Sequence, residues 1–242
     1  MKWLGMLGGG AFTLVSFAVG LRLLGLSWRT RQLPELLIGA SMLLLAGLGY
    51  PLSAVARESA GLADGLRTAL GALAGVLAAL GLTANSAFTF VLFRRHARWA
   101  RAFVMGVGAF CLALLVAQSL AGDWIHGDRF WGWLPFGITL SYGWCCLECA
   151  HYHRLLRRRL RIGLADPVVT DRFGVYAAAT GIAVVTNCAG QVYWWLGKEM
   201  LTDHTGALLL VLLGSGSSVL MWLAFLPPRA YVARVRARYS TA

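Results

Sequence analysis

The chain has 242 residues, of which 58% are hydrophobic and only 13% are charged, and its formal net charge is +12. Soluble globular proteins have about 25% charged residues, so this composition excludes an ordinary soluble enzyme or binding domain. The sequence therefore predicts an integral membrane protein.

Seven apolar runs follow one another along the chain, at residues 6–26, 36–55, 68–93, 102–121, 131–150, 173–196 and 206–226. A helix needs roughly 20 mostly apolar residues to cross about 30 Å of hydrocarbon, and each run is about that long. The first run lacks a clean small-x-small cleavage pattern, so we expect a retained helix there and not a signal peptide. Short connections leave no room for a soluble domain. We expect an all-α fold, with a single bundle of seven transmembrane helices at residues 1–228 and a basic cytoplasmic tail at residues 229–242.

The distribution of basic residues predicts the orientation of this bundle. Cytoplasmic loops of membrane proteins retain Lys and Arg. Of the 22 basic residues, 17 flank the same ends of the predicted helices, whereas Lys2, Arg57, Arg67, Arg129 and Lys198 flank the other ends together with six acids, one of which is Glu199. The amino terminus is therefore expected outside and the carboxyl terminus in the cytoplasm, and the expected location is the inner membrane of a bacterium.

The arginines after the third and fifth helices exceed what orientation requires. Basic segments beside a membrane attract anionic lipids by about 1 kcal/mol per charge, and guanidinium groups bind phosphate well. Orientation alone is the alternative explanation. No nucleic-acid recognition module accompanies the charge, so nucleic acid is not expected. The arginines expected to bind anionic lipid headgroups or an acidic cytoplasmic partner are Arg94, Arg95, Arg98, Arg101, Arg154, Arg157, Arg158, Arg159 and Arg161.

The inner end of the fifth helix, "LSYGWCCLECAHYHRLLRRRLR", carries a charge inside a predicted span. Such a charge is costly and marks a functional site by default, so Glu148 with the nearby His151 is a functional candidate. The alternative is a structural ion pair of Glu148 with Arg95 or Arg154. Helical geometry places Cys146, Cys149 and His153 on one face and Glu148 on the other. These three are only a weak metal candidate, because tetrahedral zinc needs a fourth ligand.

The sixth helix carries a polar stripe formed by Tyr176, Thr180, Asn187, Gln191 and Trp194. Such a stripe faces the bundle, where it either joins helices by hydrogen bonds or lines a cavity. Asp166 and Pro167 predict a turn before this helix, with Thr170 or Asp171 as its cap. The predicted ligand-binding residues on the third to sixth helices are Asn85, Gln118, Thr139, Tyr142, Tyr176, Thr180, Asn187, Gln191 and Trp194.

Seven helices with an external amino terminus in this length resemble the microbial rhodopsins in topology and size. Retinal binding in that family requires a lysine midway along the last helix. The last helix here, "ALLLVLLGSGSSVLMWLAF", contains none, because Lys2 and Lys198 are the only lysines. The histidines lie in loops or at helix ends, which disfavours an intramembrane haem. We therefore predict no cofactor, and neither retinal nor haem is expected.

Three functional classes fit these features. We expect a sensor or receptor that binds a small or lipidic ligand in an intramembrane cavity and signals through its basic cytoplasmic face. A transporter or channel for a small solute is the first alternative. A lipid-modifying enzyme with its site near Glu148 and His151 is the second, although no catalytic motif is present.

Overall fold

The computed structural model describes residues 2–59, 61–125, 128–198, 200 and 203–240, and within these ranges the chain forms helices and no strand. Helix accounts for 88% of the structure. The helices are α1 (Lys2–Thr30), α2 (Leu33–Ser41), the π-helix η1 (Met42–Gly49), α3 (Tyr50–Glu58), α4 (Asp64–Phe93), α5 (Arg98–Ala121), α6 (Asp128–Leu160), α7 (Pro167–Trp195), α8 (His204–Phe225) and α9 (Arg229–Ser240). The predicted all-α fold is confirmed.

Six helical stretches in the described residues are long and apolar enough to cross a membrane, which indicates an integral membrane protein. They are Gly8–Thr30, Leu33–Glu58, Asp64–Phe93, Arg98–Ala121, Pro167–Trp195 and His204–Phe225. The sequence prediction of seven also counted the run that became α6. This helix is long, but it is rich in aromatic residues and ends in arginines, which lowers its apolar character.

Most helices extend beyond the predicted runs, and two differences concern the ends of α7 and the segment after α8. Helix α7 begins at Pro167, and the carboxylate of Asp166 accepts hydrogen bonds from Val168 N at 2.7 Å and Val169 N at 3.1 Å. Asp166 is thus the cap, and the prediction of Thr170 or Asp171 was wrong, because an Asp followed by Pro at the first helical position already satisfies the free amides. The segment predicted as a basic tail contains the helix α9, which packs against α7.

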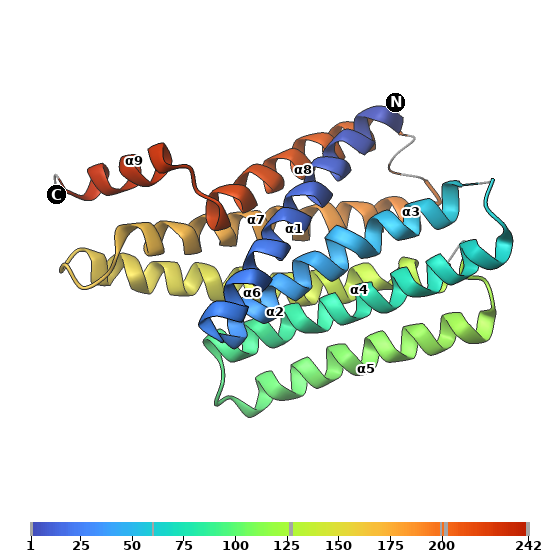
Figure 1. The fold of residues 1–242 in the computed structure, drawn as a ribbon, viewed down its shortest axis with the longest axis horizontal. Coiled ribbons are helices and arrows are strands. Elements are labelled where there is room, and N and C mark those ends of the chain that lie inside the picture. The colour runs from blue at the N-terminus through green and yellow to red at the C-terminus, as the bar shows by residue number, and fades with distance from the viewer. Residues whose placement is uncertain (1, 60, 126–127, 199, 201–202, 241–242) are drawn as a thin grey trace.

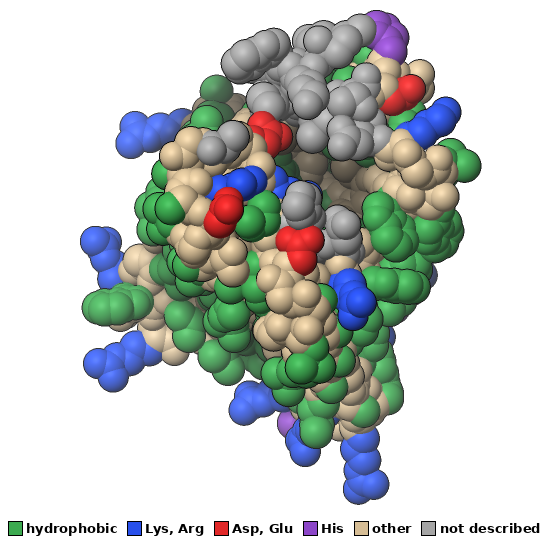
Figure 2. Space-filling view, turned by 90° about the vertical axis from the view of Figure 1, so that its right-hand side faces the viewer, with side chains coloured by type: hydrophobic (Ala, Val, Ile, Leu, Met, Phe, Trp, Pro, Cys, Tyr) green, Lys and Arg blue, Asp and Glu red, His purple; other side chains and the backbone are tan. Residues whose placement is uncertain are grey.

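The long helices run side by side along the molecule, so that the connections between them gather at its two ends (Figure 1). The α1–α2, α4–α5 and α6–α7 connections lie at one end with α9, and we call this the arginine-rich end. The α3–α4, α5–α6 and α7–α8 connections lie at the opposite end, where Figure 2 shows acidic side chains among basic ones. Glu199, predicted among these acids, lies outside the described residues.

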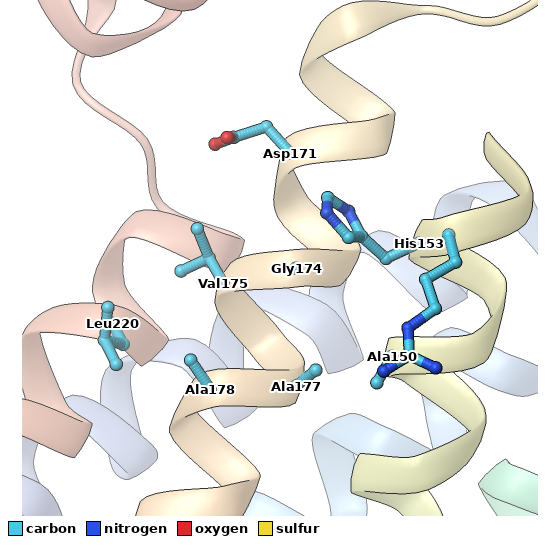
Figure 3. A pocket seen from close by; sticks show the side chains of 9 residues that line it. Ala150, His153, Asp171, Gly174, Val175, Ala177, Ala178 and Leu220 are labelled. Carbon is cyan, nitrogen blue, oxygen red and sulfur yellow. The ribbon is translucent and has the colours of Figure 1, made fainter. Parts of the chain in front are cut away.

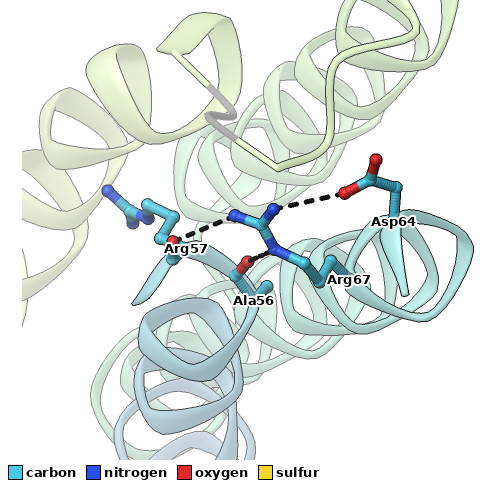
Figure 4. A network of polar contacts seen from close by, with 4 residues as sticks. All are labelled: Ala56, Arg57, Asp64 and Arg67. Carbon is cyan, nitrogen blue, oxygen red and sulfur yellow. Dashed lines mark hydrogen bonds and ion pairs between the residues drawn. The ribbon is translucent and has the colours of Figure 1, made fainter. Parts of the chain in front are cut away.

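The α3–α4 connection at the opposite end is closed by one guanidinium group (Figure 4). Arg67 donates to the carbonyl oxygens of Ala56 at 3.0 Å and Arg57 at 3.1 Å, and it pairs with Asp64 at 3.3 Å. The carbonyls at the end of α3 have no partner within their own helix, so Arg67 satisfies them as a side-chain cap.

The second predicted span is not a uniform α-helix, because η1 separates α2 from α3. The π-helix packs closely against α4, where a Cβ atom on Gly81 would lie 2.6 Å from the backbone nitrogen of Leu45. Only glycine permits this approach of two backbones, as small residues do at other membrane helix interfaces. The second span is thereby held against α4 at the level of Leu45.

The buried core divides along the bundle. In the half near the opposite end, Leu45, Leu82, Phe130, Leu134 and their neighbours form an apolar cluster. In the half near the arginine-rich end, the core also contains the thiols of Cys145 and Cys149 and the hydroxyl of Tyr176. Buried polar groups between α4 and α6 adjoin this second half, and they are the starting point for the functional site.

Candidate functional site

An ion pair between α4 and α6 neutralises Glu148 at the arginine-rich end. Arg94 Nε donates to Glu148 Oε1 at 2.6 Å, and Trp144 Nε1 donates to the same oxygen at 3.2 Å. The side chain of Glu148 is 9% exposed and that of Arg94 is 43% exposed. The hydrogen bond and the charge of Glu148 raise the pKa of Arg94 above its ordinary value. The carboxylate is therefore buried but paired.

The predicted partners of Glu148 were wrong, because Arg94 and neither Arg95 nor Arg154 forms the pair. Arg94 directly follows the last residue of α4 and faces α6, whereas Arg154 lies one and a half turns beyond Glu148 on the same helix. His151 lies one turn beyond Glu148 on the same side of α6, but it is exposed, whereas Glu148 is buried. The sequence predicted a partner for Glu148 from the correct end of α4 but named the wrong arginine.

A polar cluster between α4 and α6 lies deeper in the bundle. Asn85 Nδ2 donates to Ser141 Oγ at 2.9 Å, and the hydroxyl oxygens of Ser86 and Ser141 lie 2.7 Å apart. Thr89 donates its hydroxyl to the Asn85 carbonyl at 3.1 Å. All four side chains are fully buried. Of the cluster, Asn85 was predicted to bind a ligand, and its amide joins α4 to α6.

The other predicted ligand-binding residues are distributed over separate places. Tyr176 and Thr180 are buried, and the Thr180 hydroxyl donates within its own helix, to Tyr176 O at 2.9 Å. Asn187 Nδ2 likewise donates to Ala183 O, four residues earlier in α7, at 2.8 Å. Tyr142 is buried beside the α4–α6 cluster and Thr139 is half-buried. These residues contribute to helix packing along the bundle without converging on one point.

Two glutamines near the opposite end differ in their partners. Gln118 donates its amide to the carbonyl of Asp123 and accepts a hydrogen bond from Phe130 N at 2.9 Å, so it closes the α5–α6 connection. Gln191 is buried, yet neither its amide nitrogen nor its oxygen has a partner in the part of the chain that the structure describes. Trp194, one turn away, is 44% exposed and packs against Trp133. The stripe predicted on this helix thus leaves the bundle interior at its last turn.

A groove of about 410 Å³ opens between α6, α7 and α8 at the arginine-rich end (Figure 3). Figure 3 shows its labelled side chains, with His153 on α6, Asp171 and Val175 on α7, and Leu220 on α8. Polar and charged groups and small apolar side chains line the same space. The lining residues are Ala150, His153, Arg154, Asp171, Gly174, Val175, Ala177, Ala178 and Leu220.

The polar side chains of this groove differ in their hydrogen-bond partners. His153 Nδ1 lies 2.7 Å from the carbonyl of Thr170, and its ring occupies space that only glycine leaves free, since a Cβ atom on Gly174 would lie 2.8 Å from Cε1. Asp171 accepts a hydrogen bond from the hydroxyl of Tyr231 in α9. Burial and this bond raise the pKa of Tyr231 to about 12. Arg154 is exposed and forms no ion pair within the described residues.

The other arginines of the predicted lipid-binding set are also exposed. Among the described residues, Arg94 is the one member that forms an ion pair. The exposed members are Arg95, Arg98, Arg101, Arg154, Arg157, Arg158, Arg159 and Arg161. Their charges are therefore available to anionic groups outside the bundle.

The structure does not bring the weak metal candidates into one site. Cys146 Sγ donates to Ala177 O at 3.2 Å, whereas His153 bonds to Thr170 O in the first turn of α7, two turns before Ala177. Cys149 is fully buried beside Cys145. The described part of the chain contains no group of three or more His, Cys, Asp or Glu side chains that could hold a metal ion.

Comparison with protein-family models, curated proteins and solved structures gives no match for this chain. The functional conclusion therefore rests on the residues and their geometry.

Proposed function

We propose that the chain crosses the inner membrane of a bacterium seven times, with its amino terminus outside and its arginine-rich end in the cytoplasm. Helix α6 supplies the seventh span, because it packs against α4, α5 and α7 and runs alongside them for the length of the bundle (Figure 1). Aromatic residues near helix ends are typical of membrane interfaces and account for its lower apolar character. The orientation follows from the arginines, most of which lie at one end.

Within this topology we propose a receptor-like protein that binds an anionic amphiphile, with a phosphate headgroup and a hydrocarbon chain, in the groove between α6, α7 and α8. One observation carries the proposal: the groove joins the exposed guanidinium of Arg154 to an apolar wall that includes Val175 and Leu220. Guanidinium binds phosphate oxygens, and the wall can accept hydrocarbon. The ligand site thus lies at the membrane interface and not in the intramembrane cavity expected from the sequence.

Helix α9 is the proposed output of this receptor. Asp171 lines the groove and accepts the hydrogen bond of Tyr231, which lies on α9. A phosphate beside Asp171 repels its carboxylate and weakens this bond, since like charges are unfavourable at short distance. Helix α9 carries Arg229, Arg234, Arg236 and Arg238, which suit an acidic cytoplasmic partner. Ligand binding would thereby change how α9 is presented.

The two alternative functions have less support. A channel or transporter requires a polar lining across the membrane, but the apolar cluster around Leu82, Phe130 and Leu134 fills one half of the bundle. A lipid-modifying enzyme around Glu148 and His151 requires a free carboxylate, whereas Glu148 is paired with Arg94. The apolar cluster and the Arg94–Glu148 pair therefore support a receptor over a transporter or an enzyme.

The test measures binding of a water-soluble phosphatidylglycerol with two eight-carbon chains to the purified full chain, by calorimetry, with the matching phosphatidylcholine as reference. We expect Arg154→Gln to weaken binding of the anionic lipid by roughly fivefold or more, which corresponds to about 1 kcal/mol for one charge. Arg161→Gln is the matched control, because Arg161 is exposed in the same arginine block but does not line the groove. Equal losses for both variants, or no loss for Arg154→Gln, would contradict the groove as the binding site.

A further inference from the structure

Two buried polar atoms on neighbouring helices have no hydrogen-bond partner within the described residues. They are Ser41 Oγ, at the end of α2, and Asn85 Oδ1, in the last third of α4, and both residues are 0% exposed. A buried acceptor left without a hydrogen bond costs about 1–3 kcal/mol. Two of them at one contact between helices indicate that a group outside the chain satisfies them. We infer that a water molecule binds between Ser41 and Asn85.

The two residues lie at the same level of the bundle. Leu45 contacts Gly81, and Ser41 and Asn85 lie one turn from Leu45 and Gly81 respectively, both toward the arginine-rich end because α2 and α4 are antiparallel. Both also face the same turn of α6. Asn85 Nδ2 bonds to Ser141, and the hydroxyl of Tyr142, the next residue of α6, lies beside that of Ser41.

The chemistry of the site suits water better than an ion. Asn85 Oδ1 only accepts hydrogen bonds, whereas the Ser41 hydroxyl both donates and accepts. One water molecule can donate to Asn85 Oδ1 and share a second hydrogen bond with Ser41, and buried waters typically make about three such bonds. A cation would need a compensating charge inside the membrane. The nearby carboxylate of Glu148 is already paired with Arg94.

The position of this water coincides with a change in helix geometry. The π-helix η1 begins at Met42, directly after Ser41. Short π-helical segments widen the helix and frequently occur at functional sites. The water would connect the second span to α4 and α6 at the point where α2 ends. It would complete a polar contact between these three helices that their own side chains leave incomplete.

The test is a double-mutant cycle on the thermal midpoint of the full chain in lipid nanodiscs. We expect Ser41→Ala to lower Tm by about 2–4 °C, because the water loses one partner. In the Asn85→Ala background the same change should have no further effect, because the site is already lost. Ser53→Ala is the control, since Ser53 is buried in the same span but its hydroxyl donates within its own helix, to Tyr50 O at 2.8 Å.

Three outcomes would overturn the inference. An unchanged or higher Tm for Ser41→Ala would mean that its hydroxyl has no bound partner, and additive effects would mean that the two residues do not share one. A Tm that changes when sodium and potassium are replaced by choline would assign the site to a cation. Independent support would be a density peak within hydrogen-bond distance of both atoms in a high-resolution map of the unmodified chain.

Discussion

The two ends of the bundle satisfy their polar side chains in different ways. At the arginine-rich end two side-chain bonds join elements far apart in the sequence, Arg94 with Glu148 and Tyr231 with Asp171. At the opposite end they close connections between consecutive helices, as Arg67 and Gln118 do. Long-range bonds specify which helices lie together, whereas local bonds specify only how a loop turns. The arrangement at the arginine-rich end should therefore respond more strongly to the loss of one side chain.

The largest expected effect comes from Arg94→Ala. Removing one partner of a buried pair costs about 3–5 kcal/mol, and we expect about 3 kcal/mol here because Arg94 is partly exposed. Glu148→Gln should cost less, since the remaining charge, on the partly exposed Arg94, can reach water. Unfolding in detergent measures both, and Arg95→Ala is the exposed neighbouring control. Equal costs for Arg94→Ala and Glu148→Gln would show that burial of the carboxylate does not determine the effect.

A smaller loss is expected for Gln118→Leu at the opposite end. The substitution leaves the buried Phe130 N and the Asp123 carbonyl without the side chain that they contact, which costs about 1–3 kcal/mol. Gln191→Leu is the matched variant, because Gln191 is also buried but has no hydrogen-bond partner among the described residues. Its removal should leave the stability unchanged or raise it. If Gln191→Leu were as destabilising as Gln118→Leu, a bound group at Gln191 would be required.

Tyr231→Phe tests the long-range bond that holds α9. The loss of one hydrogen bond, about 1 kcal/mol, should increase amide exchange in α9 roughly fivefold and leave α4 unaffected. Because the folded pKa of Tyr231, about 12, lies above its ordinary value of 10.0, this contribution is complete below pH 10. It is lost as the pH rises toward 12. Unchanged exchange would mean that apolar packing alone fixes α9.

The smallest effect is expected at Asp203, the cap of α8. A hydrogen bond from Gly206 N, followed by one from the Tyr193 hydroxyl, lowers the pKa of Asp203 below its ordinary value of 3.8. The stabilisation is therefore complete above pH 3.8 and is lost as the pH falls below that value. Asp203→Asn should reduce the acid dependence of Tm slightly, because the carboxylate is open to solvent. An acid transition identical in the two proteins would contradict this contribution.

The groove shows what sequence reasoning missed and how it could have been found. Helical geometry placed His153 away from Glu148, on the side of α6 that faces α7. Helices α6 and α7 are antiparallel and joined by a short connection, so residues equally distant from its centre lie opposite each other. This symmetry pairs His153 with Gly174, whose missing side chain leaves room for the His153 ring, and Asp171 lies one turn from Gly174 on α7. Leu220 of α8 and Tyr231 of α9 carry no comparable signal, because their places depend on packing between elements that the chain order does not specify.

The sequence by itself determined the helical class, the approximate helices and the separation of charge between their ends, since these follow from the length and periodicity of apolar runs. It also indicated that Glu148 needs a partner. Only the tertiary structure decided that this partner is Arg94, that Gln118 is bonded while Gln191 is not, and that α2 ends in a π-helix. A helical period gives the direction of a side chain around its axis, but the partner that it meets depends on how neighbouring helices are placed in height and rotation.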